Sequence, residues 1–75
     1  MKIQIGKKYL HRTFAGIEVV SKITEEEVSG IFMGHLIRKK DIKNLKKAGV
    51  AYSGNEKPIE CIGVIYTFQV IKEWK

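Results

Sequence analysis

One cysteine and two histidines are the residues of this sequence that could serve as a nucleophile, a base or a metal ligand: Cys61, His11 and His35. A cysteine nucleophile needs a base beside it, and the separations along the chain neither support nor oppose such a pair. A zinc site would need a spacing such as Cys-x-x-Cys or His-x-x-x-His, which the sequence lacks. Cys61 is therefore interpreted as a small apolar strand residue, and we expect no catalytic residue, no metal and no enzymatic activity.

Two further segments have residue types suited to chemistry but an unsuitable arrangement. Residues 25–27 are adjacent glutamates, and neighbours in an extended chain point to opposite sides, so they make a poor acid and base pair. Gly6 is followed by two lysines, but not by the second glycine or the Ser or Thr of a phosphate-binding loop. We expect the glutamates to form a solubilising turn and the protein to use no cofactor.

Positive charge is the strongest functional signal in the sequence. The 14 Lys and Arg residues outnumber the 8 Asp and Glu residues, which gives a net charge of +6. Six of the cations lie close together in the chain: Arg38, Lys39, Lys40, Lys43, Lys46 and Lys47. A basic patch of this kind attracts nucleic acid, nucleotides, anionic lipid or acidic proteins. These six residues are the candidate nucleic-acid or anion site, although a merely solvated helix face is an equally good interpretation.

The histidines and the aromatic residues add little to this signal. His11 and Arg12 could join an anion site at a strand end, although an exposed pair of this kind is more often only solvated. His35 shares the alternation of its apolar neighbours, and we expect it to be partly buried. The aromatic residues that could be exposed are Tyr9, Phe14, Tyr52 and Trp74, and no base-stacking surface can be identified among them.

The clearest strand lies near the C-terminus, where alternate positions are apolar. Its apolar set is Ile62, Val64, Tyr66, Phe68 and Val70. This alternation predicts that these side chains face the core, with Ile65 on the opposite, mixed face, and the strand could split into two. Phe32 lies in a second apolar segment, and we expect both Phe32 and Phe68 to be buried.

Three more strands and one helix are predicted upstream. Residues 17–24 alternate as a half-exposed strand, residues 28–38 are apolar on both faces, and residues 2–10 form a first strand that bends near Gly6. The short connection at residues 25–27 predicts a hairpin. In the helix that follows, Asp41 is expected to cap the first turn and Gly49 to end the helix.

This order of elements predicts a mainly β protein with one short helix, arranged as a small antiparallel barrel of the SH3-like kind. The alternative is an α+β fold, in which an open antiparallel sheet packs on the helix. A chain of 75 residues is too short for a second core, so residues 1–75 are expected to form a single small domain.

Two functions fit these features. The first is a small non-enzymatic module that binds nucleic acid, because lysines on a helix contact phosphates without regard to base sequence. The second is a protein-interaction or inhibitor module, of the kind that phages and other mobile elements encode, which docks an acidic protein or sequesters a nucleotide. Self-association into a homo-oligomer is compatible with both. The single cysteine, the short apolar segments and the lack of a visible export signal predict a cytoplasmic protein that does not enter a membrane.

Overall fold

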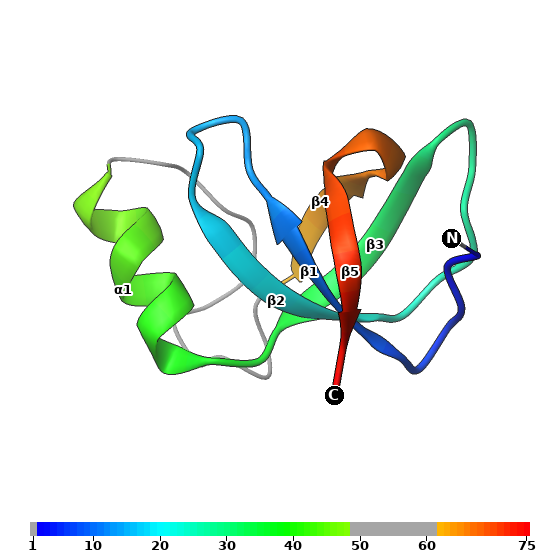
Figure 1. The fold of residues 1–75 in the computed structure, drawn as a ribbon, viewed down its shortest axis with the longest axis horizontal. Helices are drawn as coiled ribbons and strands as arrows, with labels where there is room; N and C mark the ends of the chain where they lie inside the picture. Colours follow the sequence, from blue (N-terminus) through cyan, green and yellow to red (C-terminus); the bar gives the residue numbers. More distant parts are fainter. Residues whose placement is uncertain (1, 49–61) are drawn as a thin grey trace.

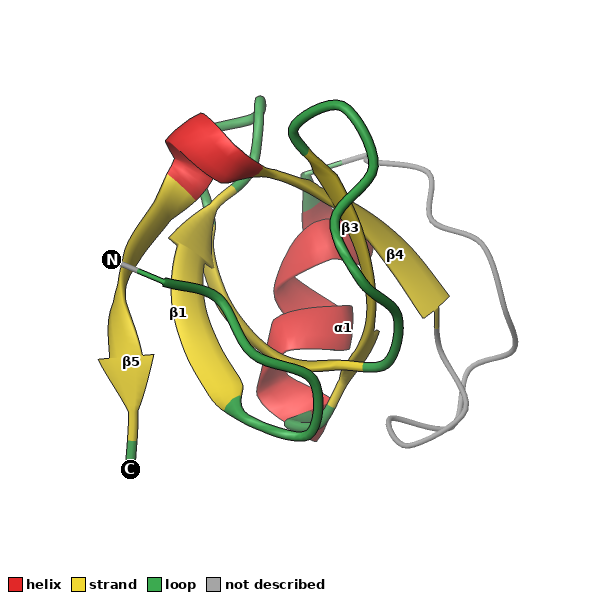
Figure 2. Cartoon of the chain, turned by 90° about the vertical axis from the view of Figure 1, so that its right-hand side faces the viewer, coloured by secondary structure: helices red, strands yellow, loops and turns green. Residues whose placement is uncertain are grey.

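The computed structural model describes residues 2–48 and 62–75. Within them the elements follow in the order β1 (Lys8–Arg12), β2 (Glu18–Ile23), β3 (Ile31–Leu36), α1 (Lys39–Lys47), β4 (Ile62–Tyr66), a 3-10 turn η2 (Thr67–Gln69) and β5 (Val70–Trp74). The strands form one antiparallel sheet in the order β4-β3-β2-β1-β5. The sheet curls into a half-barrel (Figure 2), and α1 lies at one end of it (Figure 1). The prediction of a mainly β, SH3-like barrel with one short helix is confirmed.

The predicted hairpin between the second and third strands is present, but its connection is longer than expected. Ser29 and Gly30 both have positive φ, at 53° and 80°, which is the conformation of a type I′ turn. Val28 and Ile31 close this turn through two backbone hydrogen bonds of 2.9 and 3.1 Å. β3 therefore begins at Ile31, after the turn, whereas the strand predicted from the sequence began at residue 28.

Two apolar clusters fill the half-barrel. One, between the strands, contains Tyr9, Ile23, Phe32 and Ile65. The other, under the helix, contains Val19, Leu36, Ile42 and Leu45. The predicted burial of Phe32 is confirmed, whereas Tyr9, one of the aromatic residues that the sequence allowed to be exposed, is buried. The Tyr9 hydroxyl is satisfied inside the core, because it accepts a hydrogen bond of 2.9 Å from the backbone N–H of Gln4.

Gly34 lets β4 approach β3 inside this core. A Cβ atom at this position would lie 2.9 Å from the Cδ1 atom of Ile65 and 2.9 Å from the carbonyl oxygen of Lys22. Both distances are too short for a side chain, so a glycine is required where Ile65 crosses the strand. A glycine inside a strand is typical of such a close approach of side chain and backbone.

The predicted facing of the last strand is wrong, although its division into two is confirmed. Phe68 is 74% exposed and Val64 is half exposed, while Ile65 is buried. The chain leaves β4 after Tyr66 and turns through η2, so the alternation does not continue from one strand to the next. The opposite parity also carries an apolar residue, Ile65, and the pairing of Ile65 with Phe32 places that side chain in the core.

Candidate functional site

Helix α1 presents a basic outer face. Ile42 and Leu45 pack in the cluster under the helix, which turns the other side of α1 towards solvent. The exposed side carries five of the six predicted cations: Lys39, Lys40, Lys43, Lys46 and Lys47. Lys39, Lys43 and Lys47 are four positions apart and so form one stripe along the helix. The acidic residue of α1, Asp41, is buried and does not offset this positive charge.

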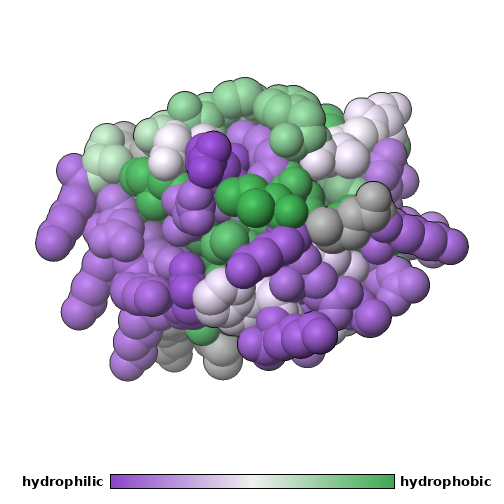
Figure 3. All heavy atoms as spheres, viewed as in Figure 1, coloured by the Kyte–Doolittle hydropathy of each residue, from purple (hydrophilic) through white to green (hydrophobic). Residues whose placement is uncertain are grey.

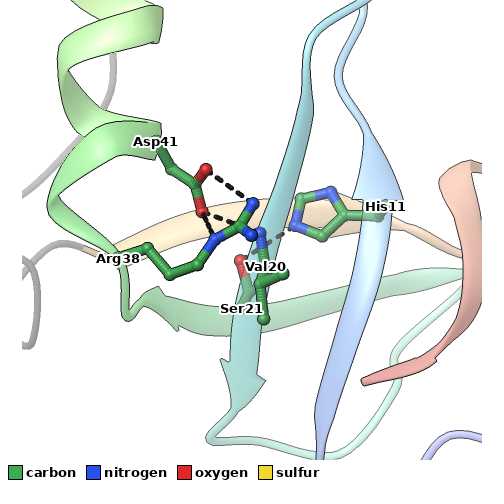
Figure 4. A network of polar contacts seen from close by, with 5 residues as sticks. All are labelled: His11, Val20, Ser21, Arg38 and Asp41. Carbon is green, nitrogen blue, oxygen red and sulfur yellow. Dashed lines mark hydrogen bonds and ion pairs between the residues drawn. The ribbon is translucent and has the colours of Figure 1, made fainter. Parts of the chain in front are cut away.

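Asp41 does not cap the helix, which corrects the expectation from the sequence. The N-cap position is Arg38, and Asp41 lies within the first turn, only 1% exposed. Its carboxylate accepts a hydrogen bond of 3.0 Å from the backbone N–H of Val20 (Figure 4). The ladder between β2 and β3 begins at Ser21, so the N–H of Val20 lies just beyond its end and takes Asp41 as its acceptor. Asp41 therefore ties the helix to the sheet.

Arg38 is the predicted cation that the structure separates from the others. Its Nε and Nη2 atoms both donate to the Asp41 carboxylate over 2.7 Å, in the bidentate geometry that Arg and carboxylate favour. Its guanidinium also lies 5.1 Å from the centre of the Trp74 ring. Only 23% of the side chain is exposed. Arg38 thus stabilises the junction of helix and sheet, and the lysines remain the candidate site.

His11 lies inside the sheet, in contrast to the exposed pair with Arg12 that the sequence suggested. It is 4% exposed, and its Nε2 atom is 2.8 Å from the Ser21 hydroxyl (Figure 4). Arg12 points outward and forms a surface ion pair of 2.7 Å with Glu18. The signal for His11 was its spacing of two from Tyr9 in the same strand, since both side chains face inward.

His11, Ser21 and Asp41 are the residue types of a hydrolase triad, but they are not arranged as one. The Asp41 carboxylate is bonded to Arg38 and Val20, and the Nδ1 atom of His11 has no partner among the described residues. A triad needs the carboxylate on that nitrogen to orient the ring, and a hydroxyl that substrate can reach. Ser21 is buried like the other two, so the arrangement is structural.

The buried imidazole makes stability depend on pH. Burial lowers the pKa of His11 from 6.5 to about 4, and the nearby Asp41 charge offsets part of this effect. Between pH 6.5 and 4 the unfolded chain therefore binds a proton that the folded protein does not. Full stability is present above pH 6.5 and is lost as the pH falls towards 4, by up to about 3 kcal/mol.

We expect this loss in urea unfolding curves measured across that pH range. The His11→Gln variant has an amide that can pair with Ser21 but does not titrate. Its free energy of unfolding should therefore fall by about 3 kcal/mol less than that of the parent over the same pH range. Asn44→Ala, at an exposed position and without an ionisable group, serves as the control and should keep the parent slope. A His11→Gln protein with the parent slope would show that the imidazole is not the titrating group.

A second exposed feature was not found from the sequence. Phe14, Tyr66 and Phe68 come together, with ring centres 5.2, 5.7 and 5.8 Å apart. Phe14 and Phe68 are 75% and 74% exposed. Phe14 lies in the turn between β1 and β2, far along the chain from the other two, so spacing gave no signal. We call these three residues the aromatic cluster.

Other predicted features leave the site unchanged. Cys61, Gly49 and Tyr52 lie outside the described residues, while His35 is half-buried as expected. Within residues 2–48 and 62–75, no three His, Cys, Asp or Glu side chains are grouped so that they could hold a metal ion. A helix of the length and apolarity needed to cross a bilayer is also not found in this part of the chain.

Comparison with protein-family models, curated proteins and solved structures found no match to the chain.

Proposed function

We propose that this protein is a small nucleic-acid-binding module whose lysines on α1 contact the phosphate backbone. The observation that carries the proposal is the outer face of α1, where five lysines lie together and the acidic residue of the helix is turned inward. Lysines at such a surface neutralise phosphates and release counterions, which supplies affinity without reading base sequence.

The lysines at the start of the helix support a role beyond folding. Lys46 and Lys47 lie in the last turn, where the helix dipole favours cations. Lys39 and Lys40 lie in the first turn, where the same dipole opposes them by about 0.3–1 kcal/mol each. Helix stability alone would favour acidic residues there. A polyanionic ligand that spans the whole helix explains cations at both ends.

The second candidate is a module that docks an acidic protein. It is favoured by β4, which forms one edge of the sheet and exposes Val64. An edge strand offers unpaired backbone groups that another chain can extend. The lysine face would then meet carboxylates, and binding would not depend on a phosphate backbone.

The salt dependence of binding to duplex DNA tests the first candidate. Contacts to about five phosphates predict a slope of log K against log salt of roughly −4 to −5. Replacing the stripe Lys39, Lys43 and Lys47 by Gln should flatten this slope by about 2 to 3 units, because each lost phosphate contact contributes about 0.9.

A charge-matched control separates local contact from net charge. The Lys8→Gln, Lys22→Gln, Lys75→Gln protein loses the same three charges at exposed positions outside α1. We expect it to keep the parent slope to within about one unit. Equal slopes for the two triple variants, or no detectable binding of DNA and RNA at low salt, would reject the nucleic-acid proposal and favour an acidic protein partner.

A further inference from the structure

The aromatic cluster forms an apolar surface where the β1–β2 turn meets η2. Phe14 and Phe68 are both exposed, and Tyr66 is half-buried beneath them. Figure 1 shows the β1–β2 turn and η2 along the upper edge of the molecule, with the C-terminal end of α1 directed towards the same side. The space-filling view shows apolar side chains along this edge, a second apolar patch near the centre of that face, and polar side chains over most of the remainder (Figure 3).

The local backbone holds these rings in place without a ligand. Gly16, with φ at 81°, and hydrogen bonds of 2.9 Å from Thr13 to Ile17 and from Gly16 to Thr13 fix the turn that carries Phe14. On the other side, the hydroxyl and the N–H of Thr67 donate to the carbonyl of Gly30 over 2.7 and 2.8 Å. The Tyr66 N–H donates to the Gln69 side chain over 3.1 Å. The cluster is therefore preorganised, which lowers the entropy that binding costs.

Leaving two phenylalanines in water is unfavourable for folding. Each ring would gain about 1.5–3 kcal/mol from full burial. Phe32 obtains this gain in the core, whereas Phe14 and Phe68 do not. Exposed apolar groups gathered in one patch mark an interaction surface more often than scattered ones do. The character of the patch is aromatic at its centre, so its ligand should offer flat π-faces.

The charge of the protein selects among ligands with flat faces. The chain carries +6 overall, and the lysine face of α1 favours a polyanion. A single-stranded nucleic acid combines a charged backbone with unpaired bases, and such strands are bound by a basic surface together with aromatic side chains. A duplex hides its base faces and could use only the lysines. We propose that unpaired bases stack on Phe14 and Phe68 while the backbone runs along α1.

The ring geometry defines how the bases would lie. A base held between two rings would need them about 7 Å apart, twice the stacking distance of about 3.4 Å. The ring centres are 5.2–5.8 Å apart, so no base fits between them. The bases stack instead on the outward faces of Phe14 and Phe68. This inference rests on the proposed function, because the same strand must also reach the lysines.

The test replaces the rings while keeping them apolar. In the Phe14→Leu, Phe68→Leu protein, affinity for a short oligothymidylate should fall about 5- to 150-fold for each stacked base lost, with the salt slope unchanged. Binding to a duplex of equal length should stay within about twofold of the parent. Ile71→Ala, a change at another exposed apolar residue, is the control and should bind both ligands as the parent does. A double leucine variant that binds the single strand like the parent would overturn the inference.

Titration with adenosine, which has no phosphate, separates this inference from the lysine proposal. Stacking predicts that NMR shifts of the Phe14 and Phe68 ring protons move with added adenosine, even if the lysine variants leave nucleic-acid binding unchanged. Rings that do not respond to adenosine, in a protein whose duplex binding still depends on the lysine stripe, would leave the proposed function standing and remove base stacking. An apolar protein partner is the remaining occupant in that outcome, since leucines would preserve its contacts.

Discussion

The Asp41→Ala protein should lose about 3–5 kcal/mol of its free energy of unfolding, because this residue is a buried charge that accepts three hydrogen bonds. The carboxylate is 1% exposed and accepts hydrogen bonds from Arg38 and from the backbone N–H of Val20. Its removal leaves the Val20 N–H buried without an acceptor and releases Arg38 from the junction. A domain of this size has a small free energy of unfolding, so we expect the variant to be largely unfolded at 37 °C.

Two further variants separate the parts of this effect. Asp41→Asn keeps an oxygen that can accept from Val20 but loses the charge paired with Arg38, so its loss should be smaller than that of Asp41→Ala. Asn44→Ala, at an exposed position of the same helix, should stay within about 0.5 kcal/mol of the parent. Urea unfolding followed by circular dichroism measures all three. An Asp41→Ala loss below about 1 kcal/mol would contradict the role of the carboxylate in joining helix and sheet.

The fold could be predicted from the sequence where a pattern had a single interpretation. Residues 17–24 alternate apart from Val20 and contain β2, and the apolar segment predicted over residues 28–38 contains β3. In residues 62–70 the alternation favoured the face that carries Val64 and Phe68, whereas Ile65 on the other face is the buried residue. That choice depends on the partner strand, since Ile65 packs on Phe32 over Gly34. Cross-strand contacts of this kind are not encoded in the period of one segment.

The candidate site divides in the same way. The lysine face of α1 could be predicted because a helix places residues three and four apart on one side, and Ile42 and Leu45 define the side that is buried. The engagement of Arg38 and Asp41 depends on the end of the β2–β3 ladder at Ser21, which only the assembled sheet reveals. The aromatic cluster joins a turn to a strand end from opposite parts of the chain. The positions of these residues along the chain give no reason to expect that their side chains are in contact.

Phe32 and Phe68 were both predicted to be buried, but changing each to alanine should lower the free energy of unfolding by very different amounts. Phe32→Ala removes a ring from the closed cluster of Tyr9, Ile23 and Ile65, and should cost about 3–5 kcal/mol through lost burial and the cavity left behind. Phe68→Ala removes a ring that is 74% exposed and whose ring contacts, within the described part of the chain, are with Phe14 and Tyr66. Its cost should be below about 2 kcal/mol, because the exposed ring loses two aromatic pairs and little buried area.

Thermal and urea unfolding of both variants, side by side with the parent, measure this difference directly. The comparison bears on function as well as on folding, because a surface ring can be changed for a binding assay only if the protein stays folded. A folded Phe68→Ala protein with weakened single-strand binding is the combination that the exposed cluster predicts. If Phe68→Ala destabilised the protein as much as Phe32→Ala does, the ring would belong to the core. The continuous alternation from residue 62 to residue 70 would then describe the strand better than the break at η2.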